Sequence, residues 1–294
     1  MINLNHKPND FNKWRKEGHK MNFSSKVKLN NGVDIPILGL GTYQIGDDEA
    51  VYNAVRAAID TGYKHIDTAA AYGNEASIGR AIKESGVKRE DIFITTKLWN
   101  EEQRKDNQYK AFEESLGRLG VDYLDMYLIH WPVRGKYVES WKILERIYKE
   151  GRARAVGVCN FHIHHLEDIF AASDLLPAVN QVECHPWLTQ VELAEYTQKK
   201  GIVFEPWSPF GVGKLLEDKK LESIAQKYNK STAQLILKWG LQRGFINIPK
   251  SANKDRILQN TQIFDFTVTE DDMAEIFKLN CGWRSGADPE TFTF

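Results

Sequence analysis

Eight short apolar runs alternate with amphipathic helical segments along this chain, and this repeat constrains the fold more than any other feature of the sequence. The runs begin near residues 37, 64, 92, 124, 153, 179, 202 and 246, and a helical segment follows each of them. Continuous apolar strands that alternate with helices are typical of a parallel sheet buried on both faces. Eight such units close most naturally into a (β/α)8 barrel, so we predict an α/β fold of the TIM-barrel class.

A doubly wound open sheet is the alternative fold for the same alternation. It would place a glycine-rich dinucleotide turn of the form G-x-G-x-x-G after its first strand. The glycines at this point of the chain are Gly39, Gly41 and Gly46, and their spacing does not match that turn. The sequence therefore favours the barrel.

Three segments lie outside the eight repeats. Residues 27–37 are predicted to form a β-hairpin through Asn31-Gly32, a dipeptide favoured in two-residue type I′ turns. In a barrel this hairpin would plug the bottom. Residues 216–230 and 269–280 are predicted to be two auxiliary helices.

The chain divides into two expected parts. Residues 1–23 form a polar extension, which we expect to be disordered, and residues 24–294 form a single barrel domain. The extension has no apolar stretch that could serve as a signal peptide. No apolar run of the chain approaches the roughly 18–20 residues that a membrane span needs.

Bulk composition argues against several classes of protein. Hydrophobic residues make up 42% of the chain, enough for a sizeable core. The formal net charge of −1 argues against a general nucleic-acid or acidic-membrane binder, because such proteins carry a clear basic excess. Three widely spaced cysteines fit free thiols in a reducing compartment. We expect a cytoplasmic, monomeric protein that acts on a small molecule.

Four residues of matching chemistry follow three successive predicted strands: Asp67, Tyr72, Lys97 and His130. The carboxyl ends of barrel strands converge on one face, so these side chains are expected to meet. A lysine within an apolar strand needs a partner, which Asp67 can supply. A cationic lysine beside a tyrosine favours the phenolate, and a nearby histidine can orient a carbonyl oxygen. The set is what the protonation of a carbonyl group needs.

At these residues the chain resembles the aldo-keto reductases, over about residues 24–294. The likeness rests on the motifs LGLGTYQ, HIDTAAAYGNE, TTKLWN, LIHWP, GVCNF, NQVECHP, WSPFG and IPKS, taken in order. It leans toward the bacterial-type 2,5-diketo-gluconate and methylglyoxal reductases. The resemblance implies NADPH-dependent reduction of aldehydes and ketones. Tyr72 would be the general acid, the pair of Lys97 and Asp67 would lower its pKa, and His130 would orient the substrate carbonyl.

The resemblance also implies an NADPH/NADP⁺ site across the barrel mouth. The amides of Asn160 and Gln181 would hold the nicotinamide carboxamide, Trp207 would stack on the nicotinamide ring, and the basic residues of 250–256 would surround the 2′-phosphate. The implied cofactor residues are Gly41, Thr42, Asp67, Asn160, Gln181, Trp207, Ser208, Phe210, Gly211, Ile248, Lys250, Ser251, Arg256, Gln259 and Asn260.

The chain departs from the family pattern at three of these contacts. Cys159 stands where a serine is more usual, Trp207 where a tyrosine is usual, and Gln259 where glutamate is frequent. The first change removes a hydroxyl donor, the second keeps an aromatic face without its hydroxyl, and the third alters the charge near the adenine.

The substrate is expected to meet an apolar wall. Tyr43, Trp99 and Trp131 each follow a strand end, and together with His130 they are the predicted substrate-binding residues. The sequence does not select among methylglyoxal, keto sugars and aromatic aldehydes. It also does not set the physiological direction of the reaction.

Two other functions stay open for the same barrel. One is a binding module that senses NADPH and regulates a partner. The other is a Schiff-base lyase or aldolase with Lys97 as nucleophile, which would need a depressed lysine pKa. No metal site is predicted, because the cluster of His162, His164 and His165 has no carboxylate at ligand spacing in the sequence.

Overall fold

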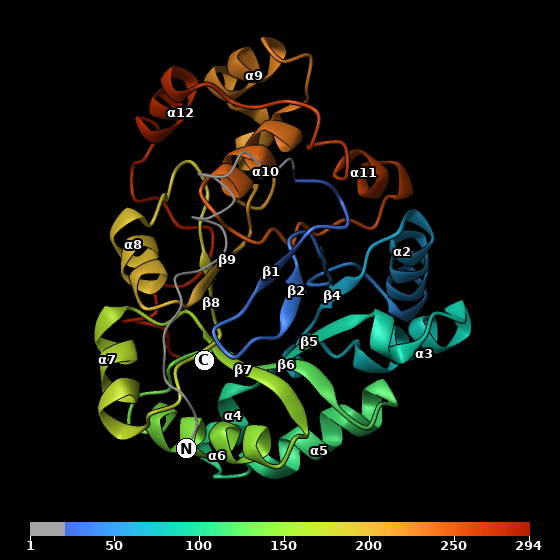
Figure 1. Ribbon diagram of the computed structural model, residues 1–294, viewed down its shortest axis with the longest axis vertical. Helices are drawn as coiled ribbons and strands as arrows, with labels where there is room; N and C mark the ends of the chain where they lie inside the picture. Colours follow the sequence, from blue (N-terminus) through green and yellow to red (C-terminus); the bar gives the residue numbers. More distant parts are fainter. Residues whose placement is uncertain (1–20) are drawn as a thin grey trace.

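The computed structural model describes residues 21–294 (Figure 1), so most of the predicted polar extension, residues 1–23, lies outside the described residues. The elements in chain order are β1 Lys26–Lys28, β2 Asp34–Pro36, β3 Leu40–Gly41, α2 Asp48–Thr61, β4 His65–Asp67, η1 Ala70–Tyr72, α3 Glu75–Ser85, η2 Arg89–Asp91, β5 Phe93–Leu98, α4 Asn100–Arg104, α5 Gln108–Leu119, β6 Leu124–Ile129, α6 Tyr137–Lys149, β7 Ala153–Cys159, α7 Ile163–Ala172, β8 Val179–Glu183, α8 Val191–Lys199, β9 Val203–Trp207, η3 Lys214–Glu217, α9 Lys219–Gln226, α10 Thr232–Gln242, α11 Lys254–Gln259 and α12 Glu270–Phe277.

The central sheet is a closed parallel barrel. Strands β3 to β9 pair in sequence order, each parallel to the next. The eighth predicted strand closes the ring through parallel bridges from Leu38 to Asn247 and from Gly41 to Lys250. Pro249 lies within this stretch and has no N–H to donate, which is why the stretch bonds only at isolated positions. The barrel prediction is confirmed, and the doubly wound alternative is wrong.

Two glycines of the first strand are required by close packing at this closure. A Cβ on Gly41 would lie 2.6 Å from the carbonyl oxygen of Ile248, which belongs to the closing stretch. A Cβ on Gly39 would lie 2.7 Å from Nδ1 of His65, on β4. The glycines that fail to match a dinucleotide turn therefore allow the first strand to approach its two neighbours.

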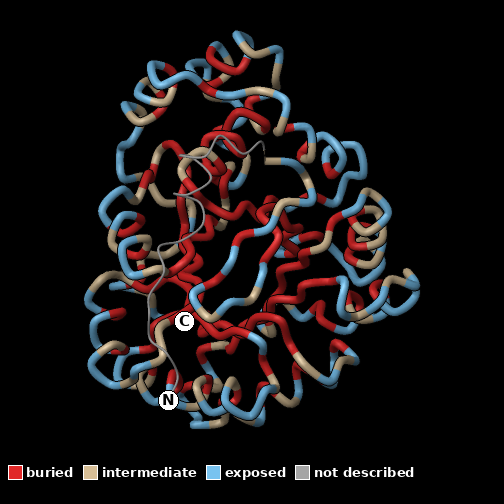
Figure 2. The backbone as a smooth tube through the Cα atoms, viewed as in Figure 1, coloured by how far each residue is buried: buried red, intermediate tan, exposed pale blue. Residues whose placement is uncertain are grey.

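The helices form the outer ring around the strands (Figure 1). In α2 the stripe of Val51, Val55 and Ala58 is buried, and the helix ends at Gly62, whose φ of 105° is left-handed. Figure 2 shows the same division over residues 21–294: the strands consist mainly of buried residues, and the outer helices alternate between buried and exposed residues. No helix among residues 21–294 is long and apolar enough to cross a membrane.

The N-terminal hairpin forms as predicted, but its turn is of a different type. Strands β1 and β2 are antiparallel, and the N–H of Leu29 donates to the carbonyl of Val33 at 2.8 Å. Three residues, Asn30, Asn31 and Gly32, thus form the loop. A type I′ turn would need positive φ at Asn31 as well, whereas only Gly32 of the three has it, at 89°. The loop has three residues where a type I′ turn has two, and its one residue with a left-handed φ is the glycine.

The hairpin covers the end of the barrel at which the strands begin. The side-chain amide of Asn31 donates to the carbonyl of Arg154, near the start of β7, at 2.9 Å. The amide of Asn30 donates to the carbonyl of Pro177, just ahead of β8, also at 2.9 Å. Ile35 of β2 is fully buried beneath. The hairpin does not cover the opposite end of the barrel, where the strands finish and where a functional site is expected.

Both auxiliary helices are confirmed, as α9 and α12. A further short helix, α4, was not predicted. It has five residues, fewer than two turns, which is too short for a helical period to stand out in the sequence. It begins directly after Trp99, and so it shapes the loop that follows β5.

Candidate active site

The four predicted catalytic residues lie at the carboxyl ends of three adjacent strands. Asp67 is the last residue of β4, Lys97 is next to last in β5, and His130 directly follows β6. Tyr72 ends the short helix η1, which follows β4. Parallel pairing of β4 with β5, and of β5 with β6, brings their carboxyl ends to one rim of the barrel.

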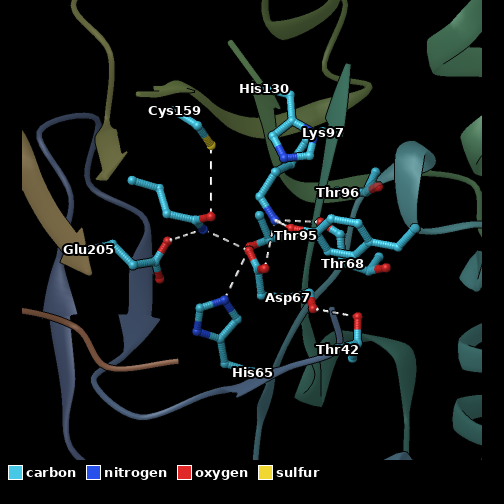
Figure 3. A network of polar contacts seen from close by, with 12 residues as sticks. Thr42, His65, Asp67, Thr68, Thr95, Thr96, Lys97, His130, Cys159 and Glu205 are labelled. Carbon is cyan, nitrogen blue, oxygen red and sulfur yellow. Dashed lines mark hydrogen bonds and ion pairs between the residues drawn. The ribbon is translucent and has the colours of Figure 1, made fainter. Parts of the chain in front are cut away.

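Lys97 is the centre of this group, and all three of its ammonium hydrogens have acceptors. Its Nζ lies 2.6 Å from Oδ1 of Asp67, 2.7 Å from the carbonyl oxygen of Thr68 and 3.4 Å from the hydroxyl of Tyr72. Figure 3 shows Lys97 pointing between Asp67 and Thr68 inside the barrel. The side chain of Lys97 is fully buried, so this geometry is fixed by packing as well as by charge.

The lysine stays protonated in this setting. Burial lowers the pKa of Lys97, but the neighbouring Asp67 carboxylate and Tyr72 raise it by more, so the pKa lies above the ordinary lysine value. A free amine at Lys97 is therefore disfavoured at neutral pH. This opposes a nucleophilic role for the side chain.

Tyr72 differs from the expectation in the net direction of its pKa. Lys97 lowers the pKa of Tyr72, as expected, but desolvation by burial is the larger effect and raises it to about 12. Asp67 adds a further rise. The tyrosine is thus a protonated hydroxyl across the physiological pH range, and the contribution of Lys97 is to limit how far its pKa rises.

His130 is a neutral imidazole next to this pair. Burial first, and then the charge of Lys97, hold the pKa of His130 well below its usual range. Its ring centre lies 5.6 Å from that of Tyr72, with the rings nearly perpendicular. Within the described residues its Nδ1 has no hydrogen-bond partner. A neutral imidazole with one N–H can donate a hydrogen bond without adding a second positive charge beside Lys97.

The loop that carries Tyr72 is tied to the barrel by Asn74. Asn74 directly precedes α3, but its side chain makes no cap bond to that helix. Its Nδ2 donates to the carbonyl of Thr42 at 3.0 Å, and its Oδ1 accepts from the hydroxyl of Thr68 at 2.6 Å. Thr42 in turn donates to the carbonyl of Asp67 at 2.9 Å. Thr42, predicted as a cofactor contact, therefore also fixes the loop after β4.

Gln181 and Glu205 extend the network, and Glu205 was missed by the sequence analysis. Nε2 of Gln181 lies 2.8 Å from Oδ2 of Asp67 and 2.8 Å from Oε2 of Glu205, so both of its hydrogens have carboxyl acceptors. Burial, and then the charge of Asp67, raise the pKa of Glu205 to about 8. The signal for it was a glutamate inside an apolar strand, the same signal that identified Lys97.

Because both hydrogens of its amide nitrogen are taken, Gln181 can make a further hydrogen bond only through its Oε1. That oxygen accepts from the thiol of Cys159 at 3.8 Å, which is a weak contact. Figure 3 shows Cys159 and Glu205 on opposite sides of this group. Burial raises the pKa of Cys159 well above its usual range, so the thiol is protonated and unreactive.

Asn160 and Trp207, both predicted to hold the nicotinamide, contact each other. The indole N–H of Trp207 donates to Oδ1 of Asn160 at 2.8 Å. Nδ2 of Asn160 donates to the carbonyl of His130 at 2.9 Å. Asn160 has a left-handed φ of 65°, which asparagine tolerates better than most residues. This contact links the carboxyl ends of β6, β7 and β9.

The remaining predicted cofactor residues make no side-chain hydrogen bond or ion pair to Asp67, Tyr72, Lys97 or His130 within the described part of the chain. Ile248, Ser251, Gly211 and Asn260 are buried, Ser208 and Phe210 are half-buried, and Lys250, Arg256 and Gln259 are exposed. Within residues 21–294 no carboxylate pairs with the two cations of this set. Their predicted roles stay predictions.

Aromatic rings surround the tyrosine and the histidine. Tyr43 lies 4.9 Å from Tyr72 between ring centres, and Trp99 lies 5.1 Å from His130. Trp131 is buried, and its ring contacts are with phenylalanines at the end of the chain.

The end of the chain supplies two aromatics that the sequence analysis did not assign. The ring of Phe294 stacks on Trp99 at 5.9 Å with an interplanar angle of 7°, and it meets Trp131 edge-on at 5.2 Å. Phe292 lies 5.1 Å from Trp131. Two phenylalanines in the last three positions were the only signal for this contact. All four predicted substrate residues are thus joined by ring contacts to Tyr72 or to these two phenylalanines.

A carboxylate at the end of β8 holds this segment, residues 281–294, which we call the C-terminal tail. Glu183 accepts from the backbone N–H and the hydroxyl of Ser285, both at 2.5 Å, and from the N–H of Gly286 at 3.3 Å. The hydroxyl of Ser285 lies 3.0 Å from that of Ser208. A Cβ on Gly286 would lie 2.5 Å from the indole of Trp207, so glycine is needed there.

Comparison with known proteins identifies the same family over most of the chain. The model of the aldo/keto reductase family matches residues 37–280. The oxidoreductase YtbE of Bacillus subtilis is 53% identical over 274 residues, which cover 92% of this chain and 98% of that protein. The glyoxal reductase of Bacillus subtilis is 50% identical over 268 residues, which cover 91% of this chain and 97% of that protein.

Solved structures agree with the fold. A Bombyx mori aldo-keto reductase, crystallised in complex with NADP, superposes with a TM-score of 0.85 at 37% identity. The match covers 91% of this chain and 96% of that chain. At this level of identity and coverage the barrel is shared over its whole length.

Proposed function

The chain belongs to the aldo/keto reductase family, and from this premise we propose that it reduces aldehydes and ketones with NADPH, with Tyr72 as the acid that protonates the carbonyl oxygen. The observation that carries the proposal is the position of Lys97, whose ammonium bridges the Asp67 carboxylate and the Tyr72 hydroxyl. No other buried lysine–carboxylate pair of the described residues also reaches a tyrosine hydroxyl.

The residues present fit a nicotinamide cofactor. Gln181 has one amide oxygen that only a weak thiol donor contacts, which suits the amide hydrogens of a carboxamide. Trp207 offers an aromatic face beside it. Lys250 and Arg256 are exposed cations with no carboxylate partner within residues 21–294, which suits a phosphate. The bound cofactor supplies the hydride that reduces the carbonyl carbon.

Tyr72 acts on the oxygen of the same carbonyl. As negative charge develops there, the hydroxyl of Tyr72 donates its proton, and Lys97 stabilises the phenolate that remains. A pKa of about 12 suits this step, because an alkoxide is a stronger base than such a phenolate and the transfer runs downhill. The proton is held until the alkoxide forms.

His130 orients the carbonyl without taking part in the proton transfer. Its low pKa keeps it neutral, so one ring N–H can donate to the carbonyl oxygen. Asn160 fixes the backbone of His130 from one side, and the perpendicular ring of Trp99 packs on the other. The hydroxyl of Tyr72 and this N–H then define where the oxygen lies.

Gln181 is oriented by the two carboxyl groups on either side of it. Because Asp67 and Glu205 accept both hydrogens of its amide nitrogen, the amide cannot rotate to present a donor. We assign Glu205 a positioning role: it directs the oxygen of Gln181 toward the carboxamide. Toward the carboxamide, Gln181 is then a hydrogen-bond acceptor only.

Small carbonyl compounds are the proposed substrate class. Within this class we favour a dicarbonyl, because the chain is 50% identical to the glyoxal reductase of Bacillus subtilis. The aromatic wall of Tyr43, Trp99 and Trp131 offers few polar anchors, which suits a compound held mainly by its reacting carbonyl. We also propose that residues 24–294 act as one domain and as a monomer.

The test is the loss of NADPH absorbance against a panel of glyoxal, methylglyoxal, a keto sugar and an aromatic aldehyde, with NADH run alongside. The Tyr72→Phe variant should lose about 10²–10⁴-fold in kcat and keep its affinity for NADPH. Wild-type activity in this variant would reject the acid assignment. NADPH binding without turnover of any carbonyl would instead favour the sensing module, and borohydride trapping of substrate on Lys97 would favour the aldolase.

A further inference from the structure

Three histidines and one carboxylate meet where the C-terminal tail crosses the start of α7. His162 directly precedes this helix, and His164 and His165 lie in its first turn. Glu167 and Asp168 follow them on α7, and the fold brings Glu290 of the tail to the histidines. The cluster lies apart from the catalytic group, and the proposed reaction gives it no role.

Two of the histidines contact the carboxylate directly, and the third lies close to it. Oε1 of Glu290 lies 2.7 Å from Nδ1 of His162 and 3.4 Å from Nε2 of His164. One ligand atom each of His164, His165 and Glu290 lies within 4.8 Å of the others. The rings of His164 and His165 are 3.9 Å apart between centres. Two imidazoles this close cannot both be cationic at low energy, whereas both can be neutral ligands of one ion.

We infer that His162, His164, His165 and Glu290 form a binding site for a divalent transition-metal ion of the Zn²⁺ and Ni²⁺ class, which fastens the C-terminal tail to α7. Imidazole nitrogens and a carboxylate oxygen are ligands that such ions prefer. Two ligand atoms on a tetrahedral Zn²⁺ lie about 3.3 Å apart, given bonds of about 2.0–2.1 Å. The separations of 2.7 and 3.4 Å at Glu290 lie on either side of that value.

The side chains have room for the remaining adjustment. The side chains of His164 and Glu290 are 57% and 46% exposed, so both can rotate and an ion can reach them from solvent. His165 is buried, and its Nδ1 accepts from the backbone N–H of His162 at 3.1 Å, so it joins the site only by giving up that bond. The first two ligands are thus mobile and the third is fixed in place.

One effect opposes the site. A helix N-terminus carries partial positive charge, which disfavours a cation there. The negative charge of Glu290 offsets that effect.

Metal binding here would reach the substrate wall through the tail. Glu290 lies two and four residues before the phenylalanines that contact Trp131 and Trp99. Fixing Glu290 on α7 therefore restricts the part of the tail that contacts Trp99 and Trp131. Binding itself does not depend on the proposed reductase activity, because it is measured without substrate or cofactor.

The experiment titrates ZnCl₂, and separately NiCl₂, into the chelator-treated full-length chain in competition with a chromophoric chelator. We expect a single ion per chain. Binding should weaken roughly 10-fold or more in His164→Ala and in Glu290→Gln. The matched control is His6→Ala with His19→Ala, which removes the two histidines that lie outside the described residues and should leave binding unchanged.

Two results would overturn the inference. Binding that survives both site variants, or that disappears in the control, would place the ion elsewhere. Hydrogen exchange tests the fastening: Zn²⁺ should slow exchange of the tail amides in the wild-type chain but not in Glu290→Gln. Equal exchange with and without Zn²⁺ would show that the tail is not fastened by metal.

Discussion

The inner and outer halves of the candidate site are built by different means. The inner half is the polar network of Asp67, Lys97, Gln181 and Glu205, which lies on strands and is almost entirely buried. The outer half is the aromatic wall, which stands on loops and on the C-terminal tail, and Tyr43 in it is 55% exposed. One half is fixed by hydrogen bonds inside the sheet, and the other by ring contacts between segments distant in sequence.

Under the proposed function, this difference separates the residues that carry out the chemistry from those that select the substrate. A buried charge that loses its partner is strongly penalised, so the network tolerates little change and sets the reaction. Ring contacts between loops can be altered with smaller penalties, so the wall can vary and set the substrate. If this division holds, variants in the network should change stability and turnover, and variants in the wall should change KM for particular substrates.

The largest effect is expected for Lys97→Met. It leaves Asp67 buried without its cation and Tyr72 without a stabiliser for its phenolate. Unfolding in urea should show a loss of about 3–5 kcal/mol, and kcat should fall by about 10²–10⁴-fold. Lys136→Met is the control, because its partner Asp106 is largely exposed and loss of an exposed pair should change stability by less than about 1 kcal/mol. Similar losses in the two variants would contradict the division.

Much of the inner half could be predicted from the sequence, for a physical reason. Charged residues within apolar strands stand out against the pattern, and parallel pairing in chain order places their ends on one rim. The same reasoning should have found Glu205, since it too interrupts an apolar strand. Its partner Gln181 was seen only as a cofactor contact, so the carboxyl on the far side of it was overlooked.

The outer half could be predicted only in part. Tyr43, Trp99 and Trp131 follow strand ends, so the strand pattern locates them. Phe294 reaches Trp99 only because the tail folds back across the barrel, which no local pattern encodes. The net pKa of Tyr72 was also missed, because the extent of its desolvation depends on the packing of the whole rim.

The second prediction concerns Glu205→Gln and pH. In the folded chain the carboxyl of Glu205 keeps its proton up to about pH 8, whereas in the unfolded chain it titrates near its ordinary value of 4.5. Between these values the folded state binds the extra proton, so this group lowers stability as pH rises from 4.5 to 8. The Glu205→Gln variant should lack that fall. The difference in free energy of unfolding, variant minus wild type, should therefore be larger at pH 8 than at pH 5 by on the order of 3 kcal/mol. The free energies of unfolding are measured in urea. If those of the variant and the wild type change by the same amount from pH 5 to pH 8, Glu205 does not titrate as proposed.

The third prediction concerns Phe294, which contacts the aromatic wall. Phe294→Ala removes the ring that stacks on Trp99 and leaves the network untouched. We expect KM for an aromatic aldehyde to rise about 10-fold, the range for loss of one apolar contact. KM for glyoxal should change much less, since so small a substrate cannot span from the carbonyl site to this ring. Tyr123→Ala is a suitable control for loss of an aromatic ring, because its cation–π partner Arg89 lies at the base of β5. Equal increases for both substrates would mean that the ring supports the site as a whole.

The smallest effect is expected for Ser285→Ala, at the junction of the two halves. The change removes the hydroxyl that joins Glu183 to Ser208, but Glu183 keeps the backbone N–H groups of the tail. One lost hydrogen bond to a carboxylate corresponds to about 1.5–3 kcal/mol at most, and the remaining donors should reduce the loss. We expect a few-fold rise in KM for aromatic aldehydes with kcat within about 2-fold of wild type, because the network lies beneath the junction and does not depend on it. A fall in kcat as large as that of Lys97→Met would mean that the tail positions the acid itself, and the two halves would then be one unit.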